Sequence, residues 1–198
     1  ISVTAGSTYD SMTDVPTLTS ATAANYAVLN AVDIGYSAVL SEANLKVSTA
    51  SSGNAAASST MAMTGNTYWE VTIGSNSQIG LIWGPASDAY GNSKLSMFAN
   101  GATGSLNNAT RTLSATPSWS NGDTLGFAWS SSARTLTLYQ AGSATAVMTM
   151  TTPTTGDPMI AITNYTSGAA MSSFLNCGQR PFTYTPPSGY VALNTFNL

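Results

Sequence analysis

The chain has 198 residues, no histidine and a formal net charge of −3, from five Lys and Arg against eight Asp and Glu. Only 7% of the residues are charged, whereas about a quarter is usual in a soluble domain. Scattered basic residues argue against a nucleic-acid partner, and a lone cysteine without histidine argues against a zinc site and most acid–base catalysis. No apolar run approaches the ~20 residues of a spanning helix. We expect no enzyme, cofactor, bound metal or membrane insertion.

Residues 1–20 are rich in Ser and Thr and alternate weakly, which predicts an N-terminal arm or edge strand. Within residues 21–180, apolar and polar residues alternate with period two, which is typical of half-buried strands. In 67–73, for example, Trp69, Val71 and Ile73 share one face, so Trp69 is expected in the core. The strands predicted in this way are 38–40, 45–49, 60–64, 67–73, 78–83, 95–99, 124–129, 134–139, 147–151, 159–163 and 171–176.

Turn-forming pairs separate these runs, among them Asn100-Gly101, Asn121-Gly122 and Ala141-Gly142. Residues 129–134 are typical of a hairpin connection. Many short strands with tight turns predict an all-β fold, a two-sheet antiparallel β-sandwich. Residues 181–198 contain three prolines, which exclude a central strand. They predict a Pro-rich C-terminal segment packed on the sandwich.

Four of these stretches, residues 65–73, 79–84, 121–128 and 134–142, resemble in order the conserved strands of the SPRY domain. The first reads Gly-Asn-Thr-Tyr-Trp-Glu-Val-Thr-Ile, and the third contains Asn-Gly-Asp-Thr-Leu-Gly-Phe-Ala. The resemblance covers roughly residues 21–180. It implies the concanavalin-like jelly roll of that family, in which the position of Glu70 is structural.

The flanks are similar to the version of this domain found in tailed-bacteriophage proteins. The similar stretches are residues 9–16, 24–30 and 176–194, and the most specific is Gly-Gln-Arg-Pro-Phe at 178–182, followed by Pro-Pro-Ser-Gly at 186–189. This resemblance implies a virion component, a tail fibre or related adhesin, which is extracellular when it acts. Because such fibres are usually homotrimers, a homotrimer in contact with other virion tail proteins is expected.

Three tryptophans close to predicted loops are candidate ligand-binding residues: Trp83, Trp119 and Trp129. An aromatic face near a loop can stack on the C–H groups of a sugar ring. The alternative is that each one closes the end of the core. Trp83 and Trp129 favour this alternative, because both have the parity of inward-facing strand residues, whereas for Trp119 the two interpretations are equally open.

The connection 85–94 also resembles a binding loop, because Asp88, Tyr90, Asn92 and Lys94 place a carboxylate, a phenol, an amide and an ammonium close together. Such groups bind sugar hydroxyls. We therefore add Asp88, Tyr90 and Asn92 to the candidate ligand-binding residues. The alternative is a solvated turn. No regularly spaced oxygen ligands indicate a calcium site.

These observations favour a non-catalytic attachment module whose partner is a bacterial surface polysaccharide or lipopolysaccharide. A structural virion domain, which docks to another phage protein or closes the fibre tip, is the alternative. A polysaccharide depolymerase would require two closely placed carboxylates. The eight acidic residues are spread along the chain, which argues against that activity.

Overall fold

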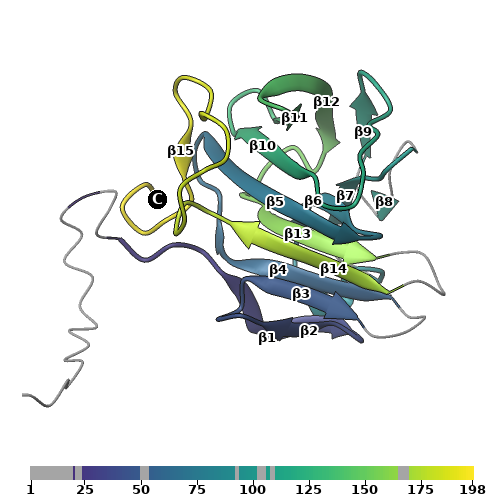
Figure 1. The fold of residues 1–198 in the computed structure, drawn as a ribbon. Helices are drawn as coiled ribbons and strands as arrows, with labels where there is room; N and C mark the ends of the chain where they lie inside the picture. The colour runs from purple at the N-terminus through teal and green to yellow at the C-terminus, as the bar shows by residue number, and fades with distance from the viewer. Residues whose placement is uncertain are drawn as a thin grey trace, which may run out of the picture.

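The computed structural model describes residues 20, 24–49, 54–91, 94–101, 106–107, 110–164 and 170–198. Two sheets pack face to face, and neighbouring strands run antiparallel except where the short β15 joins β5 (Figure 1). The all-β, two-sheet sandwich predicted from the alternation is confirmed. The predicted N-terminal arm, residues 1–20, lies outside the described residues apart from Ser20.

The two sheets have six and nine strands. The first has the order β1 (Leu29–Tyr36), β4 (Ala55–Ala62), β13 (Met159–Asn164), β6 (Gln78–Trp83), β7 (Lys94–Phe98) and β8 (Leu106–Asn107). The second has the order β2 (Val39–Ser41), β3 (Lys46–Thr49), β14 (Met171–Asn176), β5 (Thr67–Ser75), β10 (Thr124–Ser130), β11 (Thr135–Gln140), β12 (Ser143–Thr152) and β9 (Thr110–Leu113), and β15 (Val191–Ala192) pairs with β5.

The core lies between the sheets and is built from the alternating apolar residues. Trp69 on β5 is fully buried and stacks on Phe127 of β10, with ring centroids 5.6 Å apart. These two residues are directly opposite each other in the β5–β10 register. Phe98 of β7 contacts Phe127 from the other sheet, at 6.3 Å. The core position predicted for Trp69 is confirmed.

Strand boundaries differ from the predicted ones where the side chains are small or polar. The strand predicted at 60–64 is instead β4, Ala55–Ala62, whose Ala and Ser residues show no bulky alternation. The sequence pattern does not predict strand β1, because its sequence LNAVDIGY contains Asn, Asp and Gly, which are rare in strands. Pairing with β4 stabilises it, with an irregularity between Leu29 and Ile34. In both cases the tertiary pairing decides the strand.

The predicted tight turns are confirmed where strands reverse. Gly101, Gly122 and Gly142 have φ values of 64°, 93° and 78°, a region that glycine enters without steric cost. Strands β10 and β11 form the predicted hairpin, with Ser130 opposite Thr135. This antiparallel pairing brings the start of β10 and the end of β11 side by side, with Leu125 opposite Gln140.

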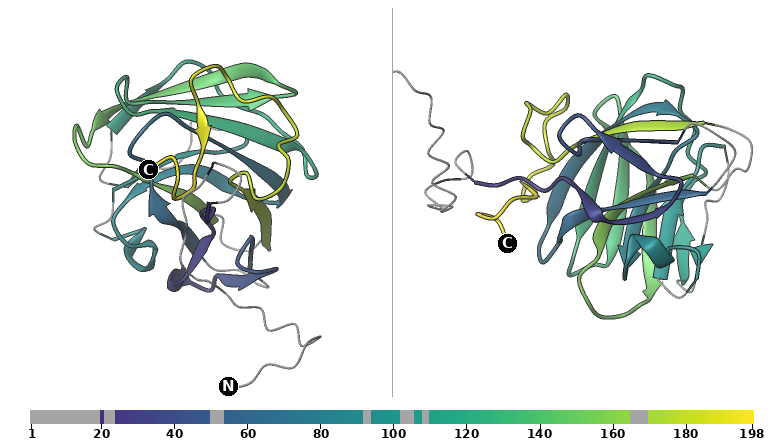
Figure 2. Two further views of the ribbon diagram at one scale, coloured as in Figure 1. Left: turned by 90° about the vertical axis from the view of Figure 1, so that its left-hand side faces the viewer. Right: turned by 90° about the horizontal axis from the view of Figure 1, so that it is seen from below.

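The C-terminal segment, residues 181–198, lies alongside β5 and β10 (Figures 1 and 2, yellow). Val191 and Ala192 form the parallel pairing with Thr67 and Tyr68 of β5. Closer to the C-terminus, the carbonyl of Leu193 accepts a hydrogen bond from the backbone N–H of Ala27 at 3.0 Å. The segment therefore joins both the nine-stranded sheet and the chain that leads into β1.

Candidate functional site

Glu70 attaches the C-terminal segment to the sandwich. Its side chain points away from the core, yet the residue is only 1% exposed because the segment covers it. One carboxylate oxygen, Oε2, accepts the N–H of Thr183 at 2.8 Å, and Oε1 accepts the N–H of Tyr184 at 2.8 Å and the hydroxyl of Tyr68 at 3.2 Å. Burial and the charge of Glu70 raise the pKa of the Tyr68 phenol, so that it remains a donor. The expected structural role of Glu70 is confirmed.

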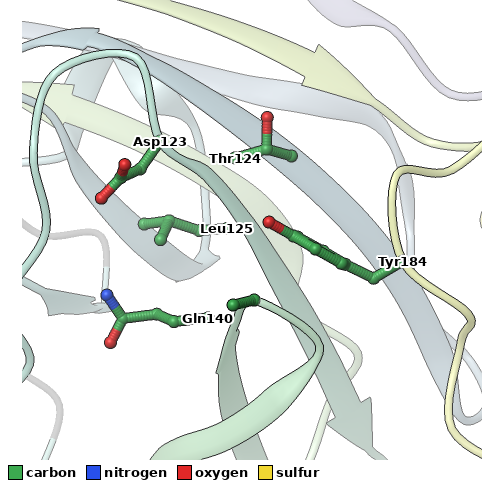
Figure 3. Close-up of a pocket in the computed structure, with 6 residues that line it drawn as sticks. Asp123, Thr124, Leu125, Gln140 and Tyr184 are labelled. Atoms are coloured by element: carbon green, nitrogen blue, oxygen red, sulfur yellow. The ribbon is translucent and has the colours of Figure 1, made fainter.

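The attached segment forms one wall of a pocket (Figure 3). Tyr184 lies on one side, and the facing residues come from the start of β10 and the end of β11. The pocket has a volume of about 260 Å³. Its lining residues are Asp123, Thr124, Leu125, Gln140, Ala141 and Tyr184.

Local hydrogen bonds hold the polar lining residues in place. Asp123 Oδ2 accepts the N–H of Ser120 at 2.8 Å, and Gln140 Nε2 donates to the carbonyl of Ser118 at 2.6 Å. These bonds occupy one polar atom of each side chain. Within the described part of the chain, Asp123 Oδ1, Gln140 Oε1 and the Tyr184 hydroxyl have no hydrogen-bond partner. The pocket therefore combines an aromatic ring with fixed groups that can bind a polar ligand.

Trp83 and Trp129 pack against each other at one end of the sandwich. Their ring centroids are 6.3 Å apart, and the guanidinium of Arg134 lies 5.4 Å from the first ring and 5.3 Å from the second. Trp129 is completely buried, so the prediction that it binds a ligand is wrong: neither ring face is accessible. Trp83 is partly exposed and donates its Nε1 hydrogen to the carbonyl of Gly156 at 3.1 Å. Both residues close the core, as the alternative interpretation stated.

Trp119 lies beyond the other end of β7. Its backbone is held by Asn100, which accepts the Trp119 N–H at 2.8 Å and donates to the Trp119 carbonyl at 2.7 Å. The residue is 7% exposed and belongs to the core. This low exposure leaves little of Trp119 accessible for stacking and favours the alternative interpretation, that it closes the end of the core.

The connection that carries Asp88 and Tyr90 lies over the six-stranded sheet and includes a 3-10 helix, η1 (Ala86–Asp88). Burial alone would raise the pKa of Asp33, which lies on β1. Hydrogen bonds that its carboxylate accepts from Ser87 and Ala86, at the start of η1, outweigh burial and lower this pKa. The Tyr90 hydroxyl donates to backbone carbonyls of β4 and β13. The connection is thus fixed to the sheet.

The remaining loop candidates do not form one site with the tryptophans. Asp88 is partly buried at the end of η1, and Asn92 lies outside the described residues. Tyr90 packs its ring on Tyr36 of β1, with centroids 5.1 Å apart. The predicted ligand-binding set is therefore divided between the two ends of the sandwich and the outer side of one sheet.

Sequence reasoning missed Asp123, Gln140 and Tyr184 as a group. Asp123 and Gln140 flank turns that the sequence indicates, and Tyr184 follows the Gly-Gln-Arg-Pro-Phe stretch. No local pattern shows that these three residues meet, because the hydrogen bond that places Tyr184 spans 114 positions.

No group of three or more metal-binding side chains occurs among the residues that the structure describes. In the same ranges, no helix has the length and apolar character required to cross a bilayer.

No family model matches the chain, and no curated protein matches it. Solved structures do match. The SPRY domain of human HERC1 is similar with a TM-score of 0.56 and 13% identity, over 77% of this chain and 99% of that one. Stonustoxin is similar with a TM-score of 0.52 and 18% identity, over 76% of this chain and 27% of that one.

A third match, the PSpry domain of TRIM65, has a TM-score of 0.47 and 16% identity, over 76% of this chain and 93% of that one. The HERC1 match covers nearly the whole of a SPRY domain. At these identities the likeness concerns the fold alone. The chain has a SPRY-like β-sandwich fold.

Proposed function

We propose that this domain is the attachment module of a bacteriophage tail fibre and binds a glycan of the bacterial surface without catalysis. The observation that carries the proposal is the pocket between Tyr184 and the β10 and β11 turns, in which an aromatic ring faces fixed polar groups. Such combinations bind sugars, whose rings have C–H faces and hydroxyl edges. The resemblance of residues 176–194 to phage proteins supports the viral context.

The chemistry of the pocket supports binding over hydrolysis. Glycosidases of the common type require two carboxyl groups on either side of the scissile bond. Asp123 is the only carboxylate among the described residues that line the pocket. Glu70, although close in the fold, has both oxygens engaged by the backbone of the C-terminal segment.

Binding of the labelled domain to a panel of bacterial strains tests this proposal. We expect adsorption to some strains, and competition by polysaccharide extracted from those strains. Light scattering gives the oligomeric state, because three linked copies would convert weak sugar contacts into firm attachment. A folded trimeric sample that adsorbs to none of the strains would contradict the proposal.

The alternative function, docking to another virion protein, is favoured by a separate observation. Val191, Phe196 and Leu198 of the C-terminal segment are 44%, 47% and 54% exposed. Apolar side chains gathered on one segment are typical of surfaces that another protein covers. Electron microscopy of virions that showed this segment buried against a neighbouring protein would favour this alternative.

A further inference from the structure

We propose that the pocket binds one neutral or amino sugar ring and discriminates against acidic sugars through Asp123. This inference rests on the proposed glycan-binding function and names the class of sugar. The ligand is an uncharged or amino-substituted glycan, and it has the same chemistry whether it comes from a capsule or from the outer part of a lipopolysaccharide.

Tyr184 lines the pocket from a backbone that is fixed in place. Its backbone N–H is held by Glu70 Oε1 at 2.8 Å, and the preceding residue, Thr183, is held by Oε2. Gly142 lies beside Tyr184, because a Cβ built on it would be 3.7 Å from Tyr184 Cδ1. The backbone that carries the phenol ring is thus held before a ligand arrives, which reduces the entropy lost on binding.

The unpaired polar atoms of the pocket are mainly acceptors. Asp123 Oδ1 and Gln140 Oε1 can only accept hydrogen bonds, whereas the Tyr184 hydroxyl can donate or accept. Figure 3 shows Asp123 and Gln140 on the side of the pocket that faces Tyr184. A ligand that satisfies them must present donors, and the hydroxyls of a pyranose or the ammonium of an amino sugar do so.

The charge around the pocket opposes acidic ligands. No Lys or Arg is found among its described lining residues, and Asp123 carries a negative charge at the rim. A uronic acid or a phosphorylated sugar would bring a second negative charge close to this carboxylate, and like charges brought together at a binding site disfavour the complex. Asp123 is therefore expected to determine specificity.

The dimensions fit a single ring. A volume of about 260 Å³ is just below the range of about 300–1,000 Å³ that is usual for drug-sized ligands. One pyranose can therefore enter, while the rest of the glycan extends over the surface. The sugar would contact the phenol ring with its C–H face and the two acceptors with its hydroxyl edge.

The test is an NMR titration of the isotope-labelled domain with the methyl glycosides of glucose, galactose, mannose, glucosamine and glucuronic acid. We expect saturable shifts at the amides of Thr124, Gln140 and Ala141 with at least one neutral or amino sugar, with a dissociation constant in the millimolar range. Glucuronide should bind at least about tenfold more weakly, a difference of about 1.4 kcal/mol.

Two variants assign the roles. Asp123→Asn retains an oxygen that can accept the Ser120 N–H, and it should reduce the difference between neutral and acidic sugars. Tyr184→Ala should weaken the binding of every sugar. Asp157→Asn is the matched control, because Asp157 is an exposed carboxylate that does not line the pocket, and it should change neither.

Three results would overturn the inference. The first is the absence of saturable shifts at the pocket with all five glycosides, and the second is binding of the glucuronide as strong as that of the neutral sugars. The third is binding of ethylammonium, an ammonium ion without a sugar ring, as strong as that of the amino sugar. If the domain adsorbs to bacteria and Tyr184→Ala adsorbs equally well, the pocket assignment fails while the attachment function stands. If the sugars bind but no strain is recognised, the pocket assignment stands and the attachment function fails.

Discussion

Replacing Glu70 with Gln tests whether one buried carboxylate attaches the C-terminal segment. The substitution preserves the shape of the side chain and replaces one acceptor oxygen with an NH2 donor. Oε2 accepts the N–H of Thr183, and Oε1 accepts the N–H of Tyr184 and the hydroxyl of Tyr68. In either orientation of the amide, its NH2 faces a backbone N–H, so at least one bond is lost.

The expected cost follows from these contacts. A hydrogen bond to a charged group contributes about 1.5–3 kcal/mol. The amide NH2 and the backbone N–H that faces it are both donors without an acceptor, which adds a desolvation penalty. We therefore expect a loss of about 2–4 kcal/mol in the free energy of docking the segment. If the segment detaches while the sandwich stays folded, the loss is limited to the free energy of docking itself.

Hydrogen exchange at single amides measures this cost where it arises. The amides of Thr183 and Tyr184 should exchange about 30–700-fold faster in Glu70→Gln, since each 1.4 kcal/mol corresponds to a factor of ten. Urea unfolding of the same variant reports how much of the loss reaches the whole domain. If both amides exchanged at the wild-type rate in Glu70→Gln, this carboxylate would not be the attachment point.

The matched control is Glu42→Gln, which alters the only other glutamate of the chain. The Glu42 side chain is 49% exposed and lies 3.8 Å from Lys46 Nζ. An exposed pair of this kind contributes less than about 1 kcal/mol. The control should leave the exchange of Thr183 and Tyr184 unchanged.

The other predictions concern the packing at the end of the core and the pH dependence of stability. Trp129→Ala should lower the free energy of unfolding in urea by about 3–5 kcal/mol, because the indole is completely buried; a change below 1 kcal/mol would contradict this packing. Arg134→Met should cost about 1–3 kcal/mol in the same assay, because it removes hydrogen bonds of 2.6 and 2.9 Å to the carbonyls of Pro153 and Gly156. Stability should fall as the pH rises above 9. Burial raises the folded-state pKa values of Cys177 and Tyr68 above their ordinary 9.0 and 10.0, so only the unfolded chain releases these protons. In urea titrations, Tyr68→Phe should make this fall in stability less steep above pH 10.

Much of the sandwich is predictable from the sequence because alternation and turn chemistry are local signals. Trp69 shows this: its parity with Val71 and Ile73 places it in the core without knowledge of any partner strand. Strand β1 shows the limit, because its polar and glycine residues become a strand only through pairing with β4.

The sequence predicts the burial of the tryptophans near loops less well. Trp129 has the parity of a core residue, and its position at a strand end also suggested a binding face. Its burial depends on Trp83 and Arg134, which pack over it from other elements. Position along a strand cannot show how the end of the sandwich is covered.

The low charge and the absence of histidine, which are properties of the sequence alone, already argue against a nucleic-acid surface and a zinc site. The same sequence encodes strands and turns, since these depend on neighbouring residues. Only the tertiary structure decides that Glu70 holds Tyr184 opposite Asp123 and Gln140. The physical reason is that this pocket forms when segments distant in the chain are brought together. No hydrophobic period or short sequence motif indicates which distant segments come into contact.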